Sequence, residues 1–167
     1  MEYDYGAVLA ETGWIGGWEK MLSRIDRDDV YAGEDGTHGL ETDPHVTVLY
    51  GLHDEVHEDL VCRVCQGASG PVEVDVNGIS KFESEEYDVL KLDVESELLR
   101  EMNKALRGFP YTNDYDEYRP HVTIGYLKKG KADKYIGQFS DLVPDRASFP
   151  TMKFQPSGTD DPIRFSL

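Results

Sequence analysis

Pro44-His45-Val46-Thr47-Val48-Leu49-Tyr50 recurs later in the chain as Pro120-His121-Val122-Thr123-Ile124-Gly125-Tyr126. Because each copy has three β-branched residues behind a proline, both copies predict strands. Side chains alternate across a strand, so the His and the Thr of each copy share one face. The residues between and after them point into a core: Val46, Val48, Val122 and Ile124. By the same alternation, Tyr50 and Tyr126 are predicted on the face opposite the His.

Two such strands folded against each other would bring two imidazoles and two hydroxyls into one cleft. One His takes a proton from an attacking hydroxyl or water, and the other gives a proton to the leaving oxygen. An unperturbed imidazole titrates at about pH 6.5, so one ring can be neutral while the other is protonated. The Thr hydroxyls can donate to non-bridging phosphate oxygens. The motif therefore predicts a phosphodiesterase that needs neither a metal nor another cofactor, with His45, Thr47, His121 and Thr123 as catalytic residues.

At these residues the chain resembles the 2H phosphoesterase superfamily, which is named for two His-x-Thr motifs. The resemblance implies a bilobal α+β (LigT-like) fold in which pseudo-twofold related sheets flank a central cleft and helices lie outside. It also implies that His45, Thr47, His121 and Thr123 carry the reaction. The length of 167 residues predicts a single domain of this kind, residues 1–167.

Within the superfamily, the size, the acidic character and residues 43–52 look most like the anti-CBASS proteins of tailed phages. Those enzymes degrade cyclic oligonucleotide messengers of bacterial immunity. The resemblance implies a cyclic di- or oligonucleotide such as cyclic GMP–AMP as substrate, immune evasion as the role and the host cytoplasm as the location. Two alternatives stay open: an enzyme for 2′,5′-oligoadenylate or 2′,3′-cyclic-phosphate RNA ends, and a non-catalytic sponge that binds a nucleotide.

The net charge of −16, from 33 acidic and 17 basic residues, bears on the substrate. Proteins bind long nucleic acids largely by neutralising phosphates with Lys and Arg, and this chain lacks that excess. A short or cyclic oligonucleotide needs only a local pocket. Acidity that serves only solubility is an equal alternative. We expect a monomer with no long nucleic acid as a partner. The chain has no apolar run of membrane-spanning length and no secretory pattern at Met1–Tyr5.

Cys62 and Cys65 form a C-x-x-C pair downstream of His53 and His57. Residues 54–66 predict a helix, because Val56, Leu60 and Val64 repeat every four positions. At about 100° per residue, the two Cys and two His spread over half the helix circumference and cannot meet at one ion. We therefore expect reduced cysteines and no metal site.

The remaining periodicities predict a mixed order of strands and helices. A core stripe of Trp18, Met21, Leu22 and Ile25 indicates a helix, and residues 26–42 indicate a polar, Gly-rich loop. Ser96 and Gly108 are predicted caps of a second long helix. Further elements are strands at 5–10, 72–76, 87–94, 149–154 and 163–167, an acidic hairpin loop at 83–86, and a short helix at 132–139.

Aromatic and basic residues near the motifs are candidates for substrate binding, because a base stacked on an aromatic ring contributes about 1–3 kcal/mol. Tyr111, Tyr115 and Tyr118 occupy a loop that enters the second motif and is a candidate lid, although packing on the sheet edge is the alternative. Arg119 is a candidate phosphate ligand or an exposed salt-bridge partner. The other candidates are Trp14 for stacking, with burial under the sheet as an equal alternative, Phe82 for stacking, and Lys81 and Lys91 at the border of the cleft.

Overall fold

Eight strands form one antiparallel sheet in the order β6-β3-β4-β5-β2-β1-β7-β8. This computed structural model describes residues 5–167 except 35, 37, 68–69 and 160, so Met1–Asp4 and two positions of the loop 26–42 lie outside it. The strands are β1 (Gly6–Glu11), β2 (His45–Leu52), β3 (Val72–Glu83), β4 (Tyr87–Glu95), β5 (His121–Lys128), β6 (Arg146–Phe149), β7 (Thr151–Gln155) and β8 (Ile163–Ser166). The helices are α1 (Trp18–Arg24), η1 (Arg27–Asp29), α2 (Glu58–Cys65), α3 (Glu97–Leu106) and α4 (Asp133–Phe139).

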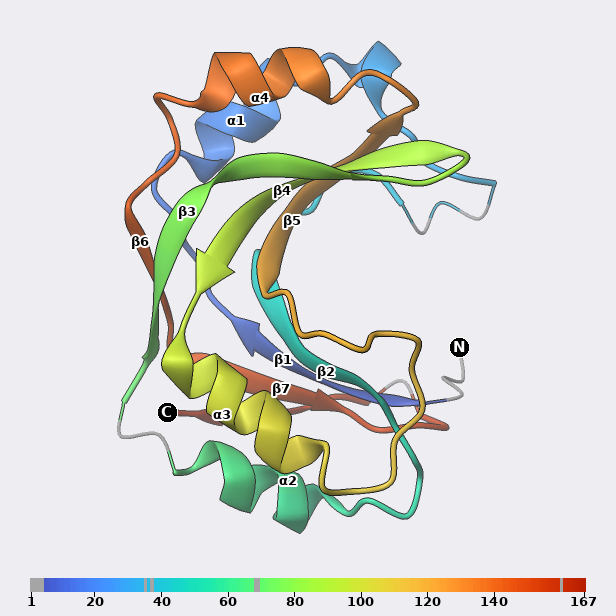
Figure 1. Ribbon diagram of the computed structural model, residues 1–167, viewed down its shortest axis with the longest axis vertical. Coiled ribbons are helices and arrows are strands. Elements are labelled where there is room, and N and C mark those ends of the chain that lie inside the picture. Colours follow the sequence, from blue (N-terminus) through green and yellow to red (C-terminus); the bar gives the residue numbers. More distant parts are fainter. Residues whose placement is uncertain (1–4, 35, 37, 68–69, 160) are drawn as a thin grey trace.

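The two motif strands meet in the middle of this sheet. β2 and β5 pair at Val46 and Val122 and then diverge, so the sheet curls into the C-shaped outline of Figure 1. Helices α1 and α4 lie at one end of the outline, and α2 and α3 lie at the other. The predicted α+β fold with two lobes is confirmed, and the two halves belong to one continuous sheet.

Each motif strand is flanked, beyond the point of pairing, by the segment that leads into the other motif. Along β5, Tyr126 accepts a backbone hydrogen bond from Tyr31 (2.9 Å) and donates one to Gly39 (2.8 Å). Along β2, the N–H of Thr112 donates to the carbonyl of Gly51 (2.9 Å). The two lobes therefore repeat one arrangement around the Val46–Val122 pair.

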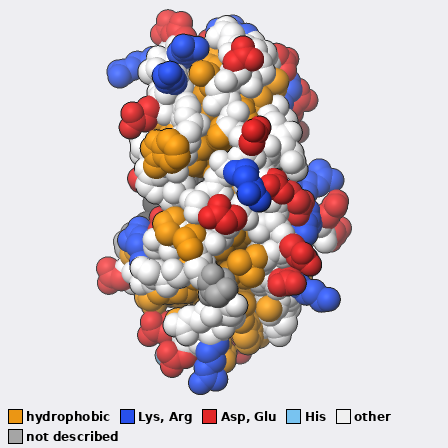
Figure 2. All heavy atoms as spheres, turned by 90° about the vertical axis from the view of Figure 1, so that its left-hand side faces the viewer, with side chains coloured by type: hydrophobic (Ala, Val, Ile, Leu, Met, Phe, Trp, Pro, Cys, Tyr) orange, Lys and Arg blue, Asp and Glu red, His pale blue; other side chains and the backbone are white. Residues whose placement is uncertain are grey.

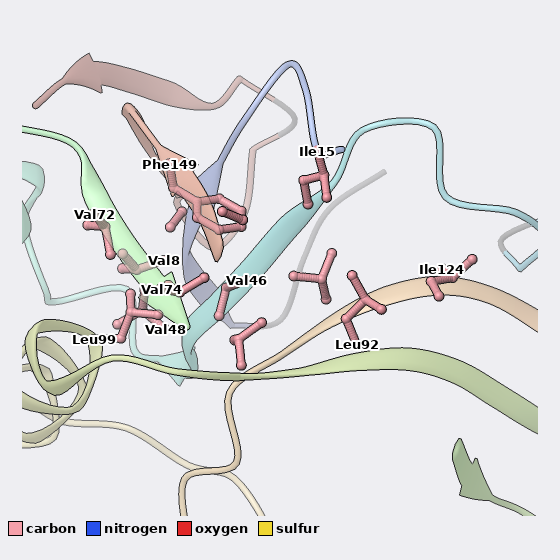
Figure 3. Close-up of a cluster of buried hydrophobic side chains, with 14 of the residues drawn as sticks. Val8, Ile15, Val46, Val48, Val72, Val74, Leu92, Leu99, Ile124 and Phe149 are labelled. Carbon is pink, nitrogen blue, oxygen red and sulfur yellow. The ribbon is translucent and has the colours of Figure 1, made fainter. Parts of the chain in front are cut away.

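The predicted core face of the motif strands is confirmed. Val46, Val48, Val122 and Ile124 have no exposed surface. In Figure 3 three of them lie in one cluster with side chains from β1, β3, β4 and β6. The helical stripe is also confirmed, since Trp18, Met21 and Ile25 are buried in the same core. Burial of this apolar surface is the main favourable contribution to folding.

Residues 149–154, predicted as one strand, are two. Phe149 ends β6, Pro150 lies between the strands, and Thr151 begins β7. Proline has no N–H to donate to a ladder, which explains the break. β6 pairs with β3 and ends the strand order on one side, whereas β7 lies between β1 and β8 near the other end.

Two other predicted boundaries also differ from the structure. The helix predicted from residue 54 begins at Glu58, because the side chain of His57 caps it by accepting from the N–H of Asp59 (3.2 Å). The strand predicted at 72–76 continues to Glu83 as a long hairpin with β4. Among the described residues, none of the helices has the length and apolar character needed to cross a membrane.

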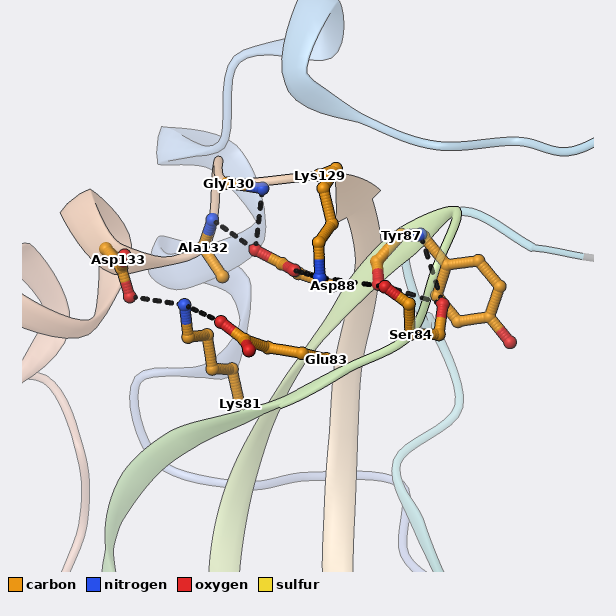
Figure 4. Close-up of polar contacts among 9 residues, drawn as sticks. All are labelled: Lys81, Glu83, Ser84, Tyr87, Asp88, Lys129, Gly130, Ala132 and Asp133. Carbon is orange, nitrogen blue, oxygen red and sulfur yellow. Dashed lines mark hydrogen bonds and ion pairs between the residues drawn. The ribbon is translucent and has the colours of Figure 1, made fainter.

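Polar contacts fix the outer end of this hairpin to the turn before α4 (Figure 4). Asp88 is fully buried and accepts from the backbone N–H groups of Gly130 (3.0 Å) and Ala132 (3.4 Å). Lys81 bridges Glu83 (2.7 Å) and Asp133 (2.8 Å), and these two carboxylates raise the pKa of its ammonium. Lys81 therefore anchors the hairpin to α4, because one of its carboxylate partners lies on β3 and the other on α4.

Candidate active site

The four motif side chains lie on one face of β2 and β5, which we call the histidine face. They alternate with Val46 and Val122, which are buried on the other face. Continuing the antiparallel Val46–Val122 pair by one residue each way puts His45 across from Thr123 and Thr47 across from His121. Each His and the Thr of the other lobe thus occupy neighbouring positions beside the Val46–Val122 pair, and His45 lies close enough to His121 to affect its pKa.

Both imidazoles are held in the same way. The Nδ1 atom of His45 lies 3.0 Å from the carbonyl oxygen of Asp43, and that of His121 lies 2.9 Å from the carbonyl oxygen of Arg119. A carbonyl can only accept, so Nδ1 carries the proton in each ring. In the neutral ring, Nε2 then keeps its lone pair and can take a proton. Among the described residues, neither Thr hydroxyl has a hydrogen-bond partner, so both can donate to a ligand.

The environment of His121 disfavours its charged form. Burial is the largest cause that lowers the pKa of His121, and the nearby Lys91 ammonium and His45 add to it. The hydrogen bond to the Arg119 carbonyl and the carboxylate of Asp93 act in the opposite direction. The net effect is a pKa below the usual value, so His121 is neutral near pH 7.

A charged network on β3 and β4 lies beside His121. In the register of β4 with β5, Lys91 is opposite Thr123 and Asp93 is opposite His121. Lys91 is 6% exposed, donates to the hydroxyl of Ser80 (2.6 Å) and forms an ion pair with Asp93. Its Nζ also lies 4.2 Å from the ring centroid of Phe82. The site thus contains a buried cation, and Ser80 and Asp93 are neighbours that the sequence did not single out.

Replacing this lysine is expected to raise the pKa of His121. In Lys91→Met the like charge is removed and the Asp93 carboxylate loses its cationic partner while it keeps the Ser80 hydroxyl (2.7 Å), and both changes favour the imidazolium. An NMR titration of the His121 ring proton measures the shift. Lys81→Met is the matched control, since that lysine pairs with Glu83 and Asp133. A His121 pKa that falls, or that moves equally in both variants, would contradict the assigned electrostatics.

Matching β-bulges in the two motif strands change the position of the motif tyrosines. Opposite β1, Leu9 pairs with Thr47 and Val8 with Leu49, so Val48 is an extra residue. Opposite β4, Lys91 pairs with Thr123 and Leu90 with Gly125, so Ile124 is the equivalent extra residue. A bulge of one residue reverses the alternation that follows it.

The prediction that Tyr50 and Tyr126 point away from the His is therefore wrong. Tyr50 pairs with Ala7, two residues before Leu9, and Tyr126 pairs with Val89, two residues before Lys91. Because residues two apart on a regular strand share a face, both tyrosines lie on the histidine face. Tyr50 is 45% exposed there.

The carbonyl of each bulged residue has a hydrogen-bond donor. The side-chain amide of Asn103, which is buried on α3, donates to the carbonyl of Val48 (2.7 Å). The backbone N–H of Glu41 donates to the carbonyl of Ile124 (2.8 Å). These donors satisfy groups that the bulges remove from the ladder, and an unpaired buried carbonyl would cost about 1–3 kcal/mol.

Of the predicted stacking residues, Phe82 lies in the site. Its ring meets His121 edge to face, with 5.0 Å between the ring centroids. Phe82 pairs with Val89, so it belongs to the histidine face. Its contacts with His121 and Lys91 hold both side chains in place beside the motif.

The loop into the second motif is bonded to β2 along its length. Tyr111 bridges to Leu52 and Tyr118 donates from its hydroxyl to the carbonyl of Thr47 (2.9 Å). Both rings pack against the core, and burial raises the pKa of Tyr118 above its usual range. Tyr115 is 66% exposed. The loop is thus an edge of the sheet, which argues against a free lid.

The side chains of Arg119 and Trp14 lie among residues other than the four motif residues. Arg119 is exposed and pairs with Glu117 (3.4 Å), while its carbonyl holds His121. Trp14 is 75% exposed and lines a hollow with Glu73, Arg146 and Ser148, where none of the four motif residues contributes. Figure 2 views the face that carries β6, where hydrophobic, acidic and basic side chains are interspersed.

The comparisons with known proteins agree with this geometry. The model of the 2'-5' RNA ligase superfamily matches residues 22–154, which is most of the chain. The chain belongs to this superfamily, whose members are the 2H phosphoesterases. No curated protein matches this chain.

Solved structures of Usb1 from Kluyveromyces marxianus share the fold of this superfamily member. The structure with uridine monophosphate has a TM-score of 0.61 at 12% identity, and each chain is covered to 99%. The structure of Usb1 alone has a TM-score of 0.59 at 11% identity, again with 99% of each chain covered. At this identity the likeness shows the fold alone.

The cysteines of this 2H phosphoesterase are free in the structure. Cys62 is partly exposed and Cys65 is buried, and burial raises the pKa of the Cys65 thiol to about 12. Over the described part of the chain, no three His, Cys, Asp or Glu side chains are grouped so that they could hold a metal ion. His57 caps α2, and His53 bonds to the Thr112 hydroxyl (2.8 Å).

Proposed function

We propose that this 2H phosphoesterase cleaves 3′,5′ linkages of a cyclic di- or oligonucleotide. The observation that carries the proposal is the arrangement of the motif residues. Two imidazoles and two hydroxyls lie on one face of a strand pair, and among the described residues neither the Nε2 atoms nor the hydroxyls have a hydrogen-bond partner. General acid–base catalysis needs such a pair on either side of the reacting phosphate.

In the proposed reaction, neutral His121 takes the proton of the ribose 2′-OH through Nε2. The 2′ oxygen attacks the phosphorus in line, and the bond from phosphorus to the 5′ oxygen breaks. Protonated His45 gives its proton to the departing oxygen, which leaves a 2′,3′-cyclic phosphate and a 5′-OH. The lowered pKa of His121 favours this assignment, because the base must begin neutral. Water can then open the cyclic phosphate with the two roles reversed.

The developing negative charge would be met by groups on the histidine face. Thr47 and Thr123 can donate hydrogen bonds to the non-bridging oxygens. Lys91 is a buried cation opposite Thr123, and its charge favours the anion over a short distance. The net charge of −16 on the whole chain favours a small ligand over long RNA, which needs an extended basic surface.

The biological role that we propose is removal of a cyclic nucleotide messenger. The resemblance of residues 43–52 to phage anti-CBASS enzymes supports this role, as does the small-ligand preference expected from the charge. A phage protein with this activity would act in the host cytoplasm as a monomer and block the antiviral signal.

A 2′-deoxy cyclic dinucleotide tests the chemistry. We expect its cleavage rate to fall to that of the His45→Ala, His121→Ala double variant, because the nucleophile is missing. The measurement compares initial rates for ribose and 2′-deoxy cyclic GMP–AMP by chromatography. Equal rates for the two compounds would refute internal attack by the 2′ oxygen.

Other substrates distinguish the remaining functions. Cleavage of 2′,5′-oligoadenylate or of 2′,3′-cyclic-phosphate ends, with the cyclic dinucleotide left intact, would assign the second enzyme function. A nucleotide recovered unchanged after denaturation of a tight complex would assign the binding function. In that case the paired imidazoles would have no acid–base role.

A further inference from the structure

Each half of the histidine face carries an aromatic cluster next to its motif. In the first half, Tyr50 contacts Tyr5 edge to face, with 6.3 Å between the ring centroids. Tyr5 in turn stacks on His53 at 5.7 Å. We call Tyr5, Tyr50 and His53 the first aromatic cluster.

The second half carries a larger group around the equivalent tyrosine. The ring centroid of Tyr126 lies 4.8 Å from that of His38 and 5.3 Å from that of Tyr87. Tyr31 packs on Tyr87 at 5.1 Å. We call Tyr31, His38, Tyr87 and Tyr126 the second aromatic cluster.

The twin bulges place the two clusters symmetrically around the histidines. Tyr50 follows Thr47 by three residues, and Tyr126 follows Thr123 by three residues. With a rise of about 3.3 Å per residue, each tyrosine Cα lies within about 10 Å of its Thr. Because β2 and β5 diverge from Val46 and Val122, the clusters lie on opposite sides of the motif residues. A phosphate bound between the two histidines would therefore have an aromatic group on each side.

We propose that Tyr50 and Tyr126 each stack one of the two nucleobases that flank the scissile phosphate. This inference rests on the proposed phosphodiesterase function and names its substrate class: a dinucleotide unit with a base on both sides of the bond. A cyclic dinucleotide or oligonucleotide fits that description. A lone nucleoside 2′,3′-cyclic phosphate fills only one of the two positions. Base stacking tolerates any base, because every base has a π face.

Each motif strand has a tyrosine two residues after its bulged residue, Tyr50 after Val48 and Tyr126 after Ile124. Tyr50 is 45% exposed although it lies beside the fully buried Leu52 and the nearly buried Leu49. The Tyr50 ring therefore has surface on the histidine face for a ligand, whereas the Tyr126 ring is partly buried and packs on His38 and Tyr87.

Binding without cleavage tests the proposal. Calorimetry would measure the Kd of 3′,3′ cyclic GMP–AMP for the His121→Ala protein and for Tyr50→Ala and Tyr126→Ala in that background. We expect each tyrosine replacement to weaken binding about 5- to 150-fold, as loss of one stacked base does. Tyr50→Phe and Tyr126→Phe keep the ring and should bind nearly as tightly as the parent, which also shows that the site remains folded.

Trp14→Ala is the aromatic control, because that exposed ring lines a separate hollow, and its Kd should equal that of the parent. An unchanged Kd in both Tyr→Ala variants, or Phe variants as weak as the Ala variants, would overturn the inference. So would absence of binding to the parent. If both tyrosines govern binding but the wild-type protein cleaves nothing, the inference stands and the proposed phosphodiesterase function fails.

Discussion

Replacing His45 or His121 with Ala is expected to lower kcat by about 10²- to 10⁴-fold, which is the usual contribution of a general acid or base. Each ring is oriented by a hydrogen bond from Nδ1 to the backbone, and truncation to Ala removes the Nε2 atom that transfers the proton. The effect should fall on kcat more than on KM, because proton transfer occurs in the transition state.

The double variant distinguishes a concerted pair from two independent groups. If both histidines act in one step, the double variant should lose little more than the worse single variant, since residues that act as a unit are not additive. Initial rates with saturating cyclic GMP–AMP measure this. His57→Ala is the matched control, because that exposed imidazole caps α2 and lies outside the motif. Activity within tenfold of wild type in either single variant would contradict the assigned roles.

Replacing Gly51 with Ala is expected to lower the free energy of unfolding by about 2–6 kcal/mol. Gly51 has φ +106°, where a Cβ is strained, and that atom would overlap the carbonyl oxygen of Thr112. Strain of this kind costs about 1–3 kcal/mol, and forced displacement of packed atoms costs a similar amount. The Thr112–Gly51 hydrogen bond beside Tyr50 would be lost as well.

Chemical denaturation of Gly51→Ala and Gly78→Ala separates these two costs. Gly78 also has a positive φ, but a Cβ there meets no atom within 4 Å, so its variant should show the backbone cost alone. Equal losses of unfolding free energy in the two variants would mean that the loop 109–118 moves away from Gly51 at no energetic cost. The loop would then not be held rigidly against β2 by its hydrogen bonds.

The sequence predicts the histidine face because alternation on a strand needs only local information. His45 and Thr47 are two residues apart, and no bulge lies between them, so period two places them correctly. The buried positions of Val46 and Val122 follow from the same rule. The caps at Ser96 and His57 differ in this respect: serine is a common N-cap, whereas a capping His is not apparent from the sequence.

Features that depend on the partner strand were not predictable in this way. The bulges at Val48 and Ile124 exist only relative to β1 and β4, so nothing in the motif itself shows that Tyr50 and Tyr126 change face. The network of Lys91 likewise depends on the register of β4 with β3 and β5. A lysine between two leucines in a buried strand was the available signal, and it marked the position without identifying Ser80 or Asp93.

The most direct test of the two-histidine mechanism is chromatography of 3′,3′ cyclic GMP–AMP after incubation with the protein in excess EDTA. The double variant His45→Ala, His121→Ala is incubated in parallel. The proposed mechanism predicts loss of the cyclic compound with the wild-type protein only, with linear products that carry a 2′,3′-cyclic phosphate or a phosphate and a 5′-OH. A compound that survives the wild-type protein, or that disappears equally with the double variant, would contradict it.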